Sequence, residues 1–371
     1  MCRWIALLST DEITLSDLVL TASNSLVKMS FNAGYHPGFG PTNNSLFNGD
    51  GFGVGWYHEN GPYPALVRDV LPAWSDANLR EVCIATRSRC VVAHVRAASP
   101  GSVVSRENCH PFKAGRLTFC HNGRVDGFWL LRRTLLADLT DEAFLSIGGT
   151  TDSEATFAMI LSNLQRDGTT EETPFQQCEP FGHERLVNAI IKAIKQLEAY
   201  SRTDFPKEFC RRFSTLNFCI TDGESVVVSR YCDRNPEIPP PSLYFAYGKA
   251  AELHKALTHG SVSGENGPGD GSQISKASVN EMVREHMSKH QSFLEFEHCV
   301  NDWEEMDPSD NAFCVASDPL TYCNQLWHPV PSNSLMYFQR GAMPGLIKMD
   351  EENDSENPED KAGSSEVAIN Q

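Results

Sequence analysis

The second residue of the chain, Cys2, carries two groups that nucleophilic catalysis can use. Its thiol is a nucleophile, and its small side chain allows methionine aminopeptidase to remove Met1 and so free the α-amino group of Cys2. An α-amino group ordinarily has a pKa of about 7.7–8.0, so it can accept the thiol proton near neutral pH, directly or through a water molecule. The position alone is weak support, because any chain can begin with Met-Cys.

Four further segments contain polar or charged residues, and three of them stand where a predicted strand ends or a predicted helix begins; the exception is the segment that starts at Asn108. They are His94-Val95-Arg96, Asn108-Cys109-His110-Pro111-Phe112, His121-Asn122-Gly123 and Thr151-Asp152-Ser153-Glu154. A fifth segment, Asn48–Trp56, is rich in glycine, which allows close backbone approach. Together with Cys2, these segments indicate a catalytic constellation.

In this order, the motifs resemble the class II (Cys-type) glutamine amidotransferases, a family of N-terminal-nucleophile hydrolases. The matching stretches within residues 1–160 are Met-Cys-Arg, N-G-D-G-F-G-V-G, H-V-R-A-A-S, H-P-F, F-C-H-N-G and T-D-S-E. Farther along, S-V-V-V-S-R-Y-C-D, I-P-P-P-S-L-Y-F-A-Y-G, V-A-S-D-P-L-T and H-P-V-P resemble the fungal glutathione-degradation (Dug-type) branch. They are similar, more loosely, to the γ-glutamyl amidohydrolase of the ergothioneine pathway. The resemblance implies an α+β fold, namely a four-layer αββα sandwich of the N-terminal-nucleophile hydrolase type.

The resemblance also implies how a γ-glutamyl amide would be cleaved. Cys2 attacks the acyl carbon, a γ-glutamyl thioester forms, and the freed α-amino group acts as the general base. The Asn122 side chain and the backbone N–H of Gly123 stabilise the oxyanion of the tetrahedral intermediate. Taken locally, Asn122-Gly123 is instead typical of a type I′ hairpin turn.

Two residues match the family's recognition of the amino-acid head of the substrate. Arg96 binds the α-carboxylate, for which a planar guanidinium is suited, and Asp152 binds the α-ammonium. His110 is expected to brace the loop that binds the substrate. The alternatives are a structural ion pair for Arg96 and a helix N-cap for Asp152 or Ser153, and capping can coexist with binding.

The rim of the substrate pocket departs from the family pattern. Arg96-Ala97-Ala98-Ser99-Pro100 stands where many amidotransferases have Arg-Trp-Ala-Thr-His, which weakens the case for free glutamine as the substrate. We expect no metal and no cofactor. Neither C-x-x-C nor H-x-x-x-H spacing occurs among the neighbouring residues His94, Cys109, His110, Cys120 and His121.

Composition narrows the class of protein further. The 371 residues have a formal net charge of −17, which disfavours duplex nucleic acid as the main partner. The 20 Phe, 9 Tyr and 6 Trp exclude a wholly disordered chain. No apolar run reaches the ~20 residues of a membrane span, and the stretch Trp4–Leu8 is too short for a signal peptide. Most of the 12 Cys have apolar neighbours, so we expect reduced thiols in a cytoplasmic protein.

Hydrophobic periodicity predicts the elements that position these residues. Strands are predicted at Arg3–Leu8, Gly51–Tyr57, Cys90–Val95, Leu117–His121, Thr215–Thr221, Ser225–Tyr231, Leu243–Tyr247, Ala312–Ala316 and Leu335–Phe338. Helices are predicted at Ile13–Met29, Ser75–Ala85, Phe128–Leu139, Glu154–Leu164 and Glu184–Tyr200. This order favours a single layered α+β domain over residues 2–345. A Gly/Ser-rich insertion at about 258–280 and an acidic tail at 346–371 are predicted to be unstructured.

Three functional hypotheses follow. The first is a hydrolase of γ-glutamyl amides, with glutathione as its substrate and a peptidase-like partner subunit, as the Dug-type resemblance implies. The second is a glutaminase subunit that passes ammonia to a partner synthase, or a γ-glutamyl amidohydrolase of ergothioneine-like biosynthesis. No phosphate loop or dinucleotide fingerprint indicates a fused synthase. The third, a catalytically silent scaffold, is disfavoured by the intact Cys2, Arg96, Asn122 and Asp152.

Overall fold

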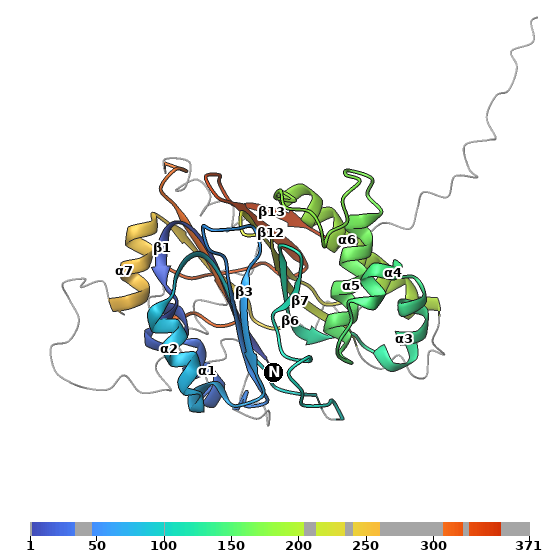
Figure 1. Ribbon diagram of the computed structural model, residues 1–371, viewed down its shortest axis with the longest axis horizontal. Coiled ribbons are helices and arrows are strands. Elements are labelled where there is room, and N and C mark those ends of the chain that lie inside the picture. Colours follow the sequence, from blue (N-terminus) through green and yellow to red (C-terminus); the bar gives the residue numbers. More distant parts are fainter. Residues whose placement is uncertain are drawn as a thin grey trace, which may run out of the picture.

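The computed structural model describes residues 2–33, 47–99, 101–203, 213–233, 240–259, 307–321 and 326–349. Their strands form two antiparallel sheets that face each other, and helices cover both outer faces (Figure 1). The layers therefore follow the order helix, sheet, sheet, helix. The expected α+β class and αββα sandwich are confirmed.

The first sheet, sheet A, contains seven strands. In spatial order they are β11 (His328–Pro329), β9 (Tyr244–Gly248), β10 (Ala312–Ala316), β1 (Arg3–Thr14), β4 (Arg87–Val95), β2 (Phe52–Trp56) and β3 (Ala65–Asp69). The N-terminal strand β1 lies at the centre, where Ile5 pairs with Ala316 of β10 and Arg3 pairs with Val95 of β4. This register places Cys2, just before β1, beside Arg96, just after β4.

The second sheet, sheet B, contains six strands. In spatial order they are β13 (Gly345–Lys348), β12 (Ser334–Gln339), β8 (Ser225–Arg230), β7 (Thr215–Thr221), β6 (Leu117–Arg124) and β5 (Phe112–Ala114). β6 contacts both β1 and β4 across the sandwich. The strand that carries His121-Asn122-Gly123 is therefore packed against the two strands that position Cys2 and Arg96.

Each outer face has its own helical layer. Sheet A is covered by the π-helix η1 (Asp17–Thr21), α1 (Leu26–Phe31), the 3₁₀ turn η2 (Ala73–Ser75), α2 (Ala77–Ala85) and α7 (Ala250–His259). Sheet B is covered by α3 (Phe128–Ala137), α4 (Asp141–Leu145), α5 (Asp152–Gln165) and α6 (His183–Thr203). Figure 1 shows the two groups on opposite sides of the sheets.

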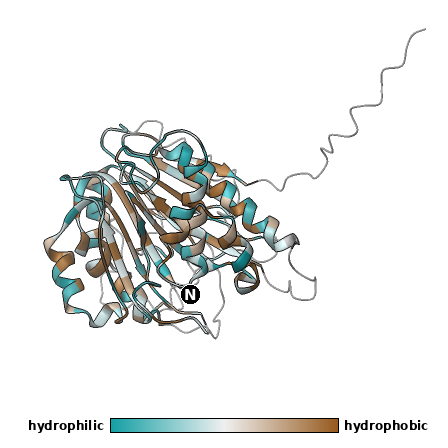
Figure 2. Cartoon of the chain, turned by 45° about the vertical axis from the view of Figure 1, so that its right-hand side comes forward, coloured by the Kyte–Doolittle hydropathy of each residue, from teal (hydrophilic) through white to brown (hydrophobic). Residues whose placement is uncertain are grey.

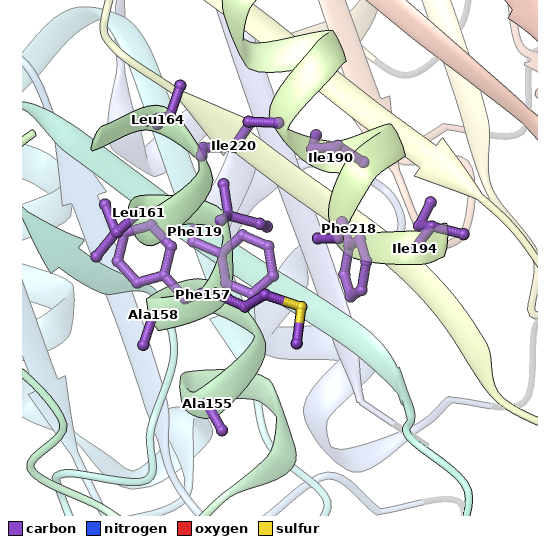
Figure 3. Close-up of a cluster of buried hydrophobic side chains, with 14 of the residues drawn as sticks. Phe119, Ala155, Phe157, Ala158, Leu161, Leu164, Ile190, Ile194, Phe218 and Ile220 are labelled. Atoms are coloured by element: carbon purple, nitrogen blue, oxygen red, sulfur yellow. The ribbon is translucent and has the colours of Figure 1, made fainter. Parts of the chain in front are cut away.

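Three clusters of buried apolar side chains hold the layers together. One fills the space between the sheets, and the other two lie between each sheet and its helices. Hydrophobic residues follow the strands and the helix faces turned toward them (Figure 2). In the sheet B cluster, Phe119 of β6 stacks on Phe157 of α5 with ring centroids 5.2 Å apart (Figure 3). This contact holds α5, the helix that begins at Asp152, against β6.

Each predicted strand is present, and four of the predicted helices correspond to α2, α3, α5 and α6. The sequence patterns missed the shorter elements β3, β5, β11, β13 and α4, and they also missed α7. Most of these elements contain too few residues for a hydrophobic period to become visible.

The predicted helix Ile13–Met29 is wrong. Ile13 belongs to β1, where it pairs with Ser88. The extended backbone of Ala22 ends η1, and Ser25 then caps a separate helix by accepting a hydrogen bond from the Lys28 N–H. The apolar spacing that suggested one helix reflects burial of several short elements against sheet A.

The predicted boundary between domain and tail at residue 346 falls inside a strand. Leu346 and Ile347 of β13 pair with Met336 and Leu335 of β12, so sheet B continues past the expected end. Residues 260–306 and 350–371, which include most of the predicted insertion and tail, lie outside the described residues. In the part of the chain that is described, the longest apolar helices fall short of what a membrane crossing requires.

Candidate active site

Cys2 lies immediately before β1 and is half-buried. Its Sγ accepts a hydrogen bond from the Ala97 N–H at 3.3 Å and can donate to the Ala97 carbonyl at 3.5 Å. Both contacts are to the backbone of the residue that follows Arg96. The thiol is therefore held beside β4 while part of its surface stays accessible.

Several other cysteines are buried, and burial disfavours the thiolate form of their side chains. Burial raises the pKa of the Cys109 thiol to about 11 and that of the Cys90 thiol to about 12. Burial also raises the pKa values of Cys120 and Cys219 well above the ordinary value. These thiols are protonated at neutral pH and serve as packing residues, as the sequence predicted.

Arg96 directly follows β4 and is 3% exposed. Its Nη2 donates hydrogen bonds to the Ser102 hydroxyl at 2.9 Å and to the Val103 carbonyl at 3.1 Å. Its Nη1 is buried and has no hydrogen-bond partner in the described chain, and no described carboxylate pairs with the guanidinium. A buried cation without a counter-charge is costly, so this arrangement suits an anionic ligand and does not fit the alternative of a structural ion pair.

Asp152 is the first residue of α5, and the N-cap is Thr151, whose hydroxyl accepts a hydrogen bond from the Glu154 N–H at 3.2 Å. The alternative that Asp152 or Ser153 serves as the N-cap is wrong, because both lie within the helix. One Asp152 oxygen accepts a hydrogen bond from the Val125 N–H at 2.8 Å, just beyond β6. A carboxylate is favoured at a helix start, and half-burial leaves this one able to accept from a ligand ammonium.

Asn122 and Gly123 lie inside β6 and pair with Asn217 and Leu216 of β7. The hairpin-turn alternative is therefore wrong, because β6 continues to Arg124. Asn122 is 2% exposed, and its side-chain Oδ1 has no partner in the described chain. A Cβ atom on Gly123 would overlap the Thr215 carbonyl oxygen, so this position accepts only glycine.

His110 lies beneath the site and contacts His94 of β4, with ring centroids 4.2 Å apart. Both rings are buried, and none of their nitrogens has a partner among the described residues. Burial, together with the nearby charge of Arg96, lowers the pKa of His94 to about 3 and that of His110 well below its ordinary value. His110 is therefore neutral and packs next to β4, the strand that leads into Arg96, and its expected bracing of the substrate loop stays a prediction.

His121 links β6 to α5. Its Nε2 donates to the Thr215 carbonyl at 2.9 Å, and burial lowers its pKa, so in the neutral ring Nδ1 accepts from the Ser153 hydroxyl at 2.9 Å. The Ser153 backbone N–H donates to the Asp152 carboxylate at 2.8 Å. Across the described ranges, no group of three or more His, Cys, Asp or Glu side chains is arranged to hold a metal ion.

Sequence reasoning missed two residues that fix the loops of the site. Asp50 accepts a hydrogen bond from the Ala98 N–H at 2.8 Å, which anchors the segment after Arg96. Asn108 donates to the Val103 carbonyl at 3.0 Å and accepts from the Thr150 N–H at 2.8 Å, which ties that segment to the start of α5. Both stand in the quoted motifs, but the sequence carried no signal of their partners.

Two facing antiparallel sheets between helical layers, with Cys2 just before a central strand, form a fold of the N-terminal-nucleophile hydrolase type. The chain belongs to the class-II glutamine amidotransferase family. The family description "Glutamine amidotransferases class-II" matches residues 15–196, a range that includes Arg96, Asn122 and Asp152 but not Cys2. As a member of this family, the protein is an enzyme that acts on carbon–nitrogen bonds.

Relatives support this assignment over different lengths. The chain is 32% identical to the probable glutamine amidotransferase DUG3 of Saccharomyces cerevisiae, covering 92% of this chain and 82% of that protein. It is 36% identical to the gamma-glutamyl-hercynylcysteine sulfoxide hydrolase of Mycolicibacterium smegmatis, over 34% of this chain and 52% of that protein. A solved glutamine aminotransferase class-II domain protein from Silicibacter pomeroyi shares the fold, with a TM-score of 0.51 at 21% identity, covering 94% of this chain and all of that one.

Proposed function

We propose that the protein hydrolyses γ-glutamyl amide bonds through a thioester on Cys2, with glutathione as its substrate. One observation carries the proposal. The buried Arg96 has an N–H group without a partner in the described chain, and the next residue, Ala97, contacts the Cys2 thiol. A site with a fixed cation beside a nucleophilic sulfur suits a substrate whose carboxylate lies close to the bond that is cleaved.

The γ-glutamyl head meets both charged residues of the site. Its α-carboxylate binds the free N–H of Arg96, and its α-ammonium binds the Asp152 carboxylate, which the Val125 N–H and the first turn of α5 already orient. These two contacts place the γ-carbonyl carbon near Cys2. Positioning of this kind lowers the barrier by removing the need to bring the groups together during the reaction.

The chemistry then needs one nucleophile, one base and an oxyanion site. The α-amino group of Cys2 takes the thiol proton, the sulfur attacks the γ-carbonyl carbon, and the Asn122 side chain with the Gly123 N–H stabilises the oxyanion. The C–N bond breaks, and the departing amine receives the proton from the α-ammonium. Water, deprotonated by the same amino group, cleaves the thioester and releases glutamate and free Cys2.

Two further parts of the proposal concern where and with what the protein works. A cytoplasmic location is supported by nine unpaired cysteines in the described part of the chain, most of them buried. A peptidase-like partner subunit is supported by the resemblance to the Dug-type branch. Such a partner would consume the Cys-Gly dipeptide that cleavage of glutathione releases.

The test is product analysis with untagged protein. Glutathione, glutamine and γ-glutamyl peptides are supplied separately, with and without cell extract as a source of partner. Glutamate, Cys-Gly and ammonia are then quantified. The Cys2→Ala variant in the same extract gives the background rate, because it keeps the fold and lacks the sulfur.

We expect Cys2-dependent release of glutamate and Cys-Gly from glutathione. Ammonia release from glutamine without cleavage of glutathione would contradict the substrate assignment and favour a glutaminase subunit. Equal rates for wild type and Cys2→Ala with every substrate, in buffer and in extract, would contradict the proposal as a whole.

A further inference from the structure

A buried guanidinium holds the carbonyl of the nucleophilic residue. Arg3, the first residue of β1, is 1% exposed, and its Nη1 donates a hydrogen bond to the Cys2 carbonyl at 3.0 Å. Its Nε donates to the carboxylate of Asp318, which lies 315 positions later in the chain. One side chain thus joins Cys2 to a residue that follows β10.

Asp318 is itself firmly placed. It is fully buried, and its second oxygen accepts a hydrogen bond from the Ser242 hydroxyl at 3.2 Å. The preceding Ser317 donates its backbone N–H to the Trp4 carbonyl at 3.0 Å, and its hydroxyl accepts from the Trp4 N–H at 3.1 Å. Ser317 and Asp318 therefore hydrogen-bond to Trp4 and Arg3, the two residues that follow Cys2.

The place of this ion pair favours a role in orienting the nucleophile. Once Met1 is removed, Cys2 is joined to the protein by a single peptide bond, so the position of the Cα atom that carries its amino group and thiol depends on how that peptide plane is held. A hydrogen bond from a fixed guanidinium to the carbonyl oxygen restricts tilting of that plane. Burying an ion pair is costly in itself and is weak support for a purely stabilising role.

We propose that Asp318 is a positioning residue for the nucleophile and that it acts through Arg3. The inference deepens the proposed function and rests on it. Asp318 orients the Arg3 guanidinium, the guanidinium holds the Cys2 carbonyl, and the held peptide plane positions the Cα atom that carries both the α-amino group and the thiol. Neither Arg3 nor Asp318 is assigned a contact with the γ-glutamyl head.

The test is a double-mutant cycle with Asp318→Asn, Arg3→Gln and the double variant, with mass spectrometry confirming removal of Met1 in each. Each single variant should lower kcat for glutathione cleavage by about tenfold or more, because preorganisation is lost. KM should change by less than about twofold, because the head-group contacts remain. The double variant should lose no more than the more impaired single variant, because both changes break the same link.

Asp222→Asn is the matched control. Asp222 is a fully buried aspartate that accepts hydrogen bonds from Phe181 N–H and Gly182 N–H, away from Cys2. This variant should lower the melting temperature and leave kcat of the folded protein unchanged. Comparing the kcat values of Asp318→Asn and Asp222→Asn therefore distinguishes a positioning role from the general effect of removing a buried carboxylate.

A second measurement needs no substrate. The rate of Cys2 alkylation by iodoacetamide, followed on the N-terminal peptide, should fall in Asp318→Asn and stay at the wild-type value in Asp222→Asn. Because this rate does not depend on γ-glutamyl cleavage, it tests the positioning role even if the proposed function fails.

Two outcomes overturn the inference. One is an Asp318→Asn variant with wild-type kcat and wild-type alkylation rate. The other is a double variant whose loss of kcat equals the product of the two single losses, which would mean that Asp318 does not act through Arg3. If Asp318→Asn does not fold, Ser242→Ala replaces it in the cycle, and it should lower kcat in wild type but not in the Arg3→Gln background.

Discussion

At the scale of one residue, the surroundings of Arg96 are the main support for the proposed substrate site. The Arg96 backbone N–H donates a hydrogen bond to the Gly51 carbonyl, and its Nη2 donates to the Ser102 hydroxyl and the Val103 carbonyl. Its buried Nη1, in contrast, has no partner in the described chain. The motif H-V-R-A-A-S was enough to predict that Arg96 belongs to the site. It was not enough to predict Ser102 and Val103 as its partners, because hydrogen bonds within a loop depend on backbone geometry that the sequence pattern does not encode.

Replacing Arg96 tests its role in binding. Arg96→Lys keeps the charge but loses the planar pair of donors, so we expect kcat/KM for the γ-glutamyl substrate to fall by about 10–100-fold, mostly through KM. The matched control is Arg116→Lys, since Arg116 is buried and donates to the Asp222 carbonyl, away from Cys2. A loss of the same size in the control, or an unchanged KM in Arg96→Lys, would contradict the assignment.

His94 makes the stability of the protein depend on pH. Its folded pKa of about 3 lies below the ordinary value of about 6.5, so only the unfolded chain binds a proton between these pH values. The free energy of unfolding should therefore fall as the pH decreases through this window, by up to about 1.4 kcal/mol per pH unit for one such histidine.

Urea unfolding at pH 7 and pH 5 measures this effect. His94→Gln should show a smaller fall in unfolding free energy between the two pH values than wild type. His58→Gln, at an exposed position, should match wild type. The same pH dependence in wild type and His94→Gln would rule out His94 as a source of the fall.

At the scale of elements, the contact between β6 and α5 aligns the proposed oxyanion site with the carboxylate of Asp152. β6 carries Asn122, α5 begins at Asp152, and His121 with Ser153 joins them near that end. Helical spacing predicted most of α5, and alternation predicted most of β6. The sequence did not show that His121 would face Ser153, because that contact depends on how a helix is rotated against a sheet.

Truncation of Phe157 tests this packing. Phe157→Ala removes the ring that stacks on Phe119, so we expect a loss of about 3–5 kcal/mol in the free energy of unfolding. The control is Phe144→Ala on α4, where a ring that is 48% exposed should contribute within about 0.5 kcal/mol. Equal destabilisation of the two variants in urea unfolding would contradict the packing described for α5.

At the scale of the whole molecule, segments from both ends of the described chain build one sheet. β1 pairs with β10, and β6 in the other sheet pairs with β7, so neither sheet is complete without residues beyond α6. The motifs near the N-terminus were readable from sequence, and so were most strands. The adjacency of β1 and β10 was not, because pairing between distant strands leaves no local signal.

A fragment of residues 2–203 tests this dependence. It contains the range matched by the family description but lacks β7 to β13, so we expect no cooperative urea transition and no γ-glutamyl hydrolysis. Co-expression of residues 213–349 is expected to restore a folded complex. Cooperative unfolding of the fragment alone would show that the first half forms an independent domain.

The acyl-enzyme on Cys2 is the most direct test of the account. Untagged protein is mixed with glutathione, quenched in acid during turnover, and digested, and the N-terminal peptide is analysed by mass spectrometry. We predict a γ-glutamyl group on Cys2 that hydroxylamine removes, and its absence from Cys2→Ala, which should retain less than about a tenth of the wild-type activity. Turnover of glutathione with the γ-glutamyl group on another residue, or undiminished turnover by Cys2→Ala, would contradict the mechanism.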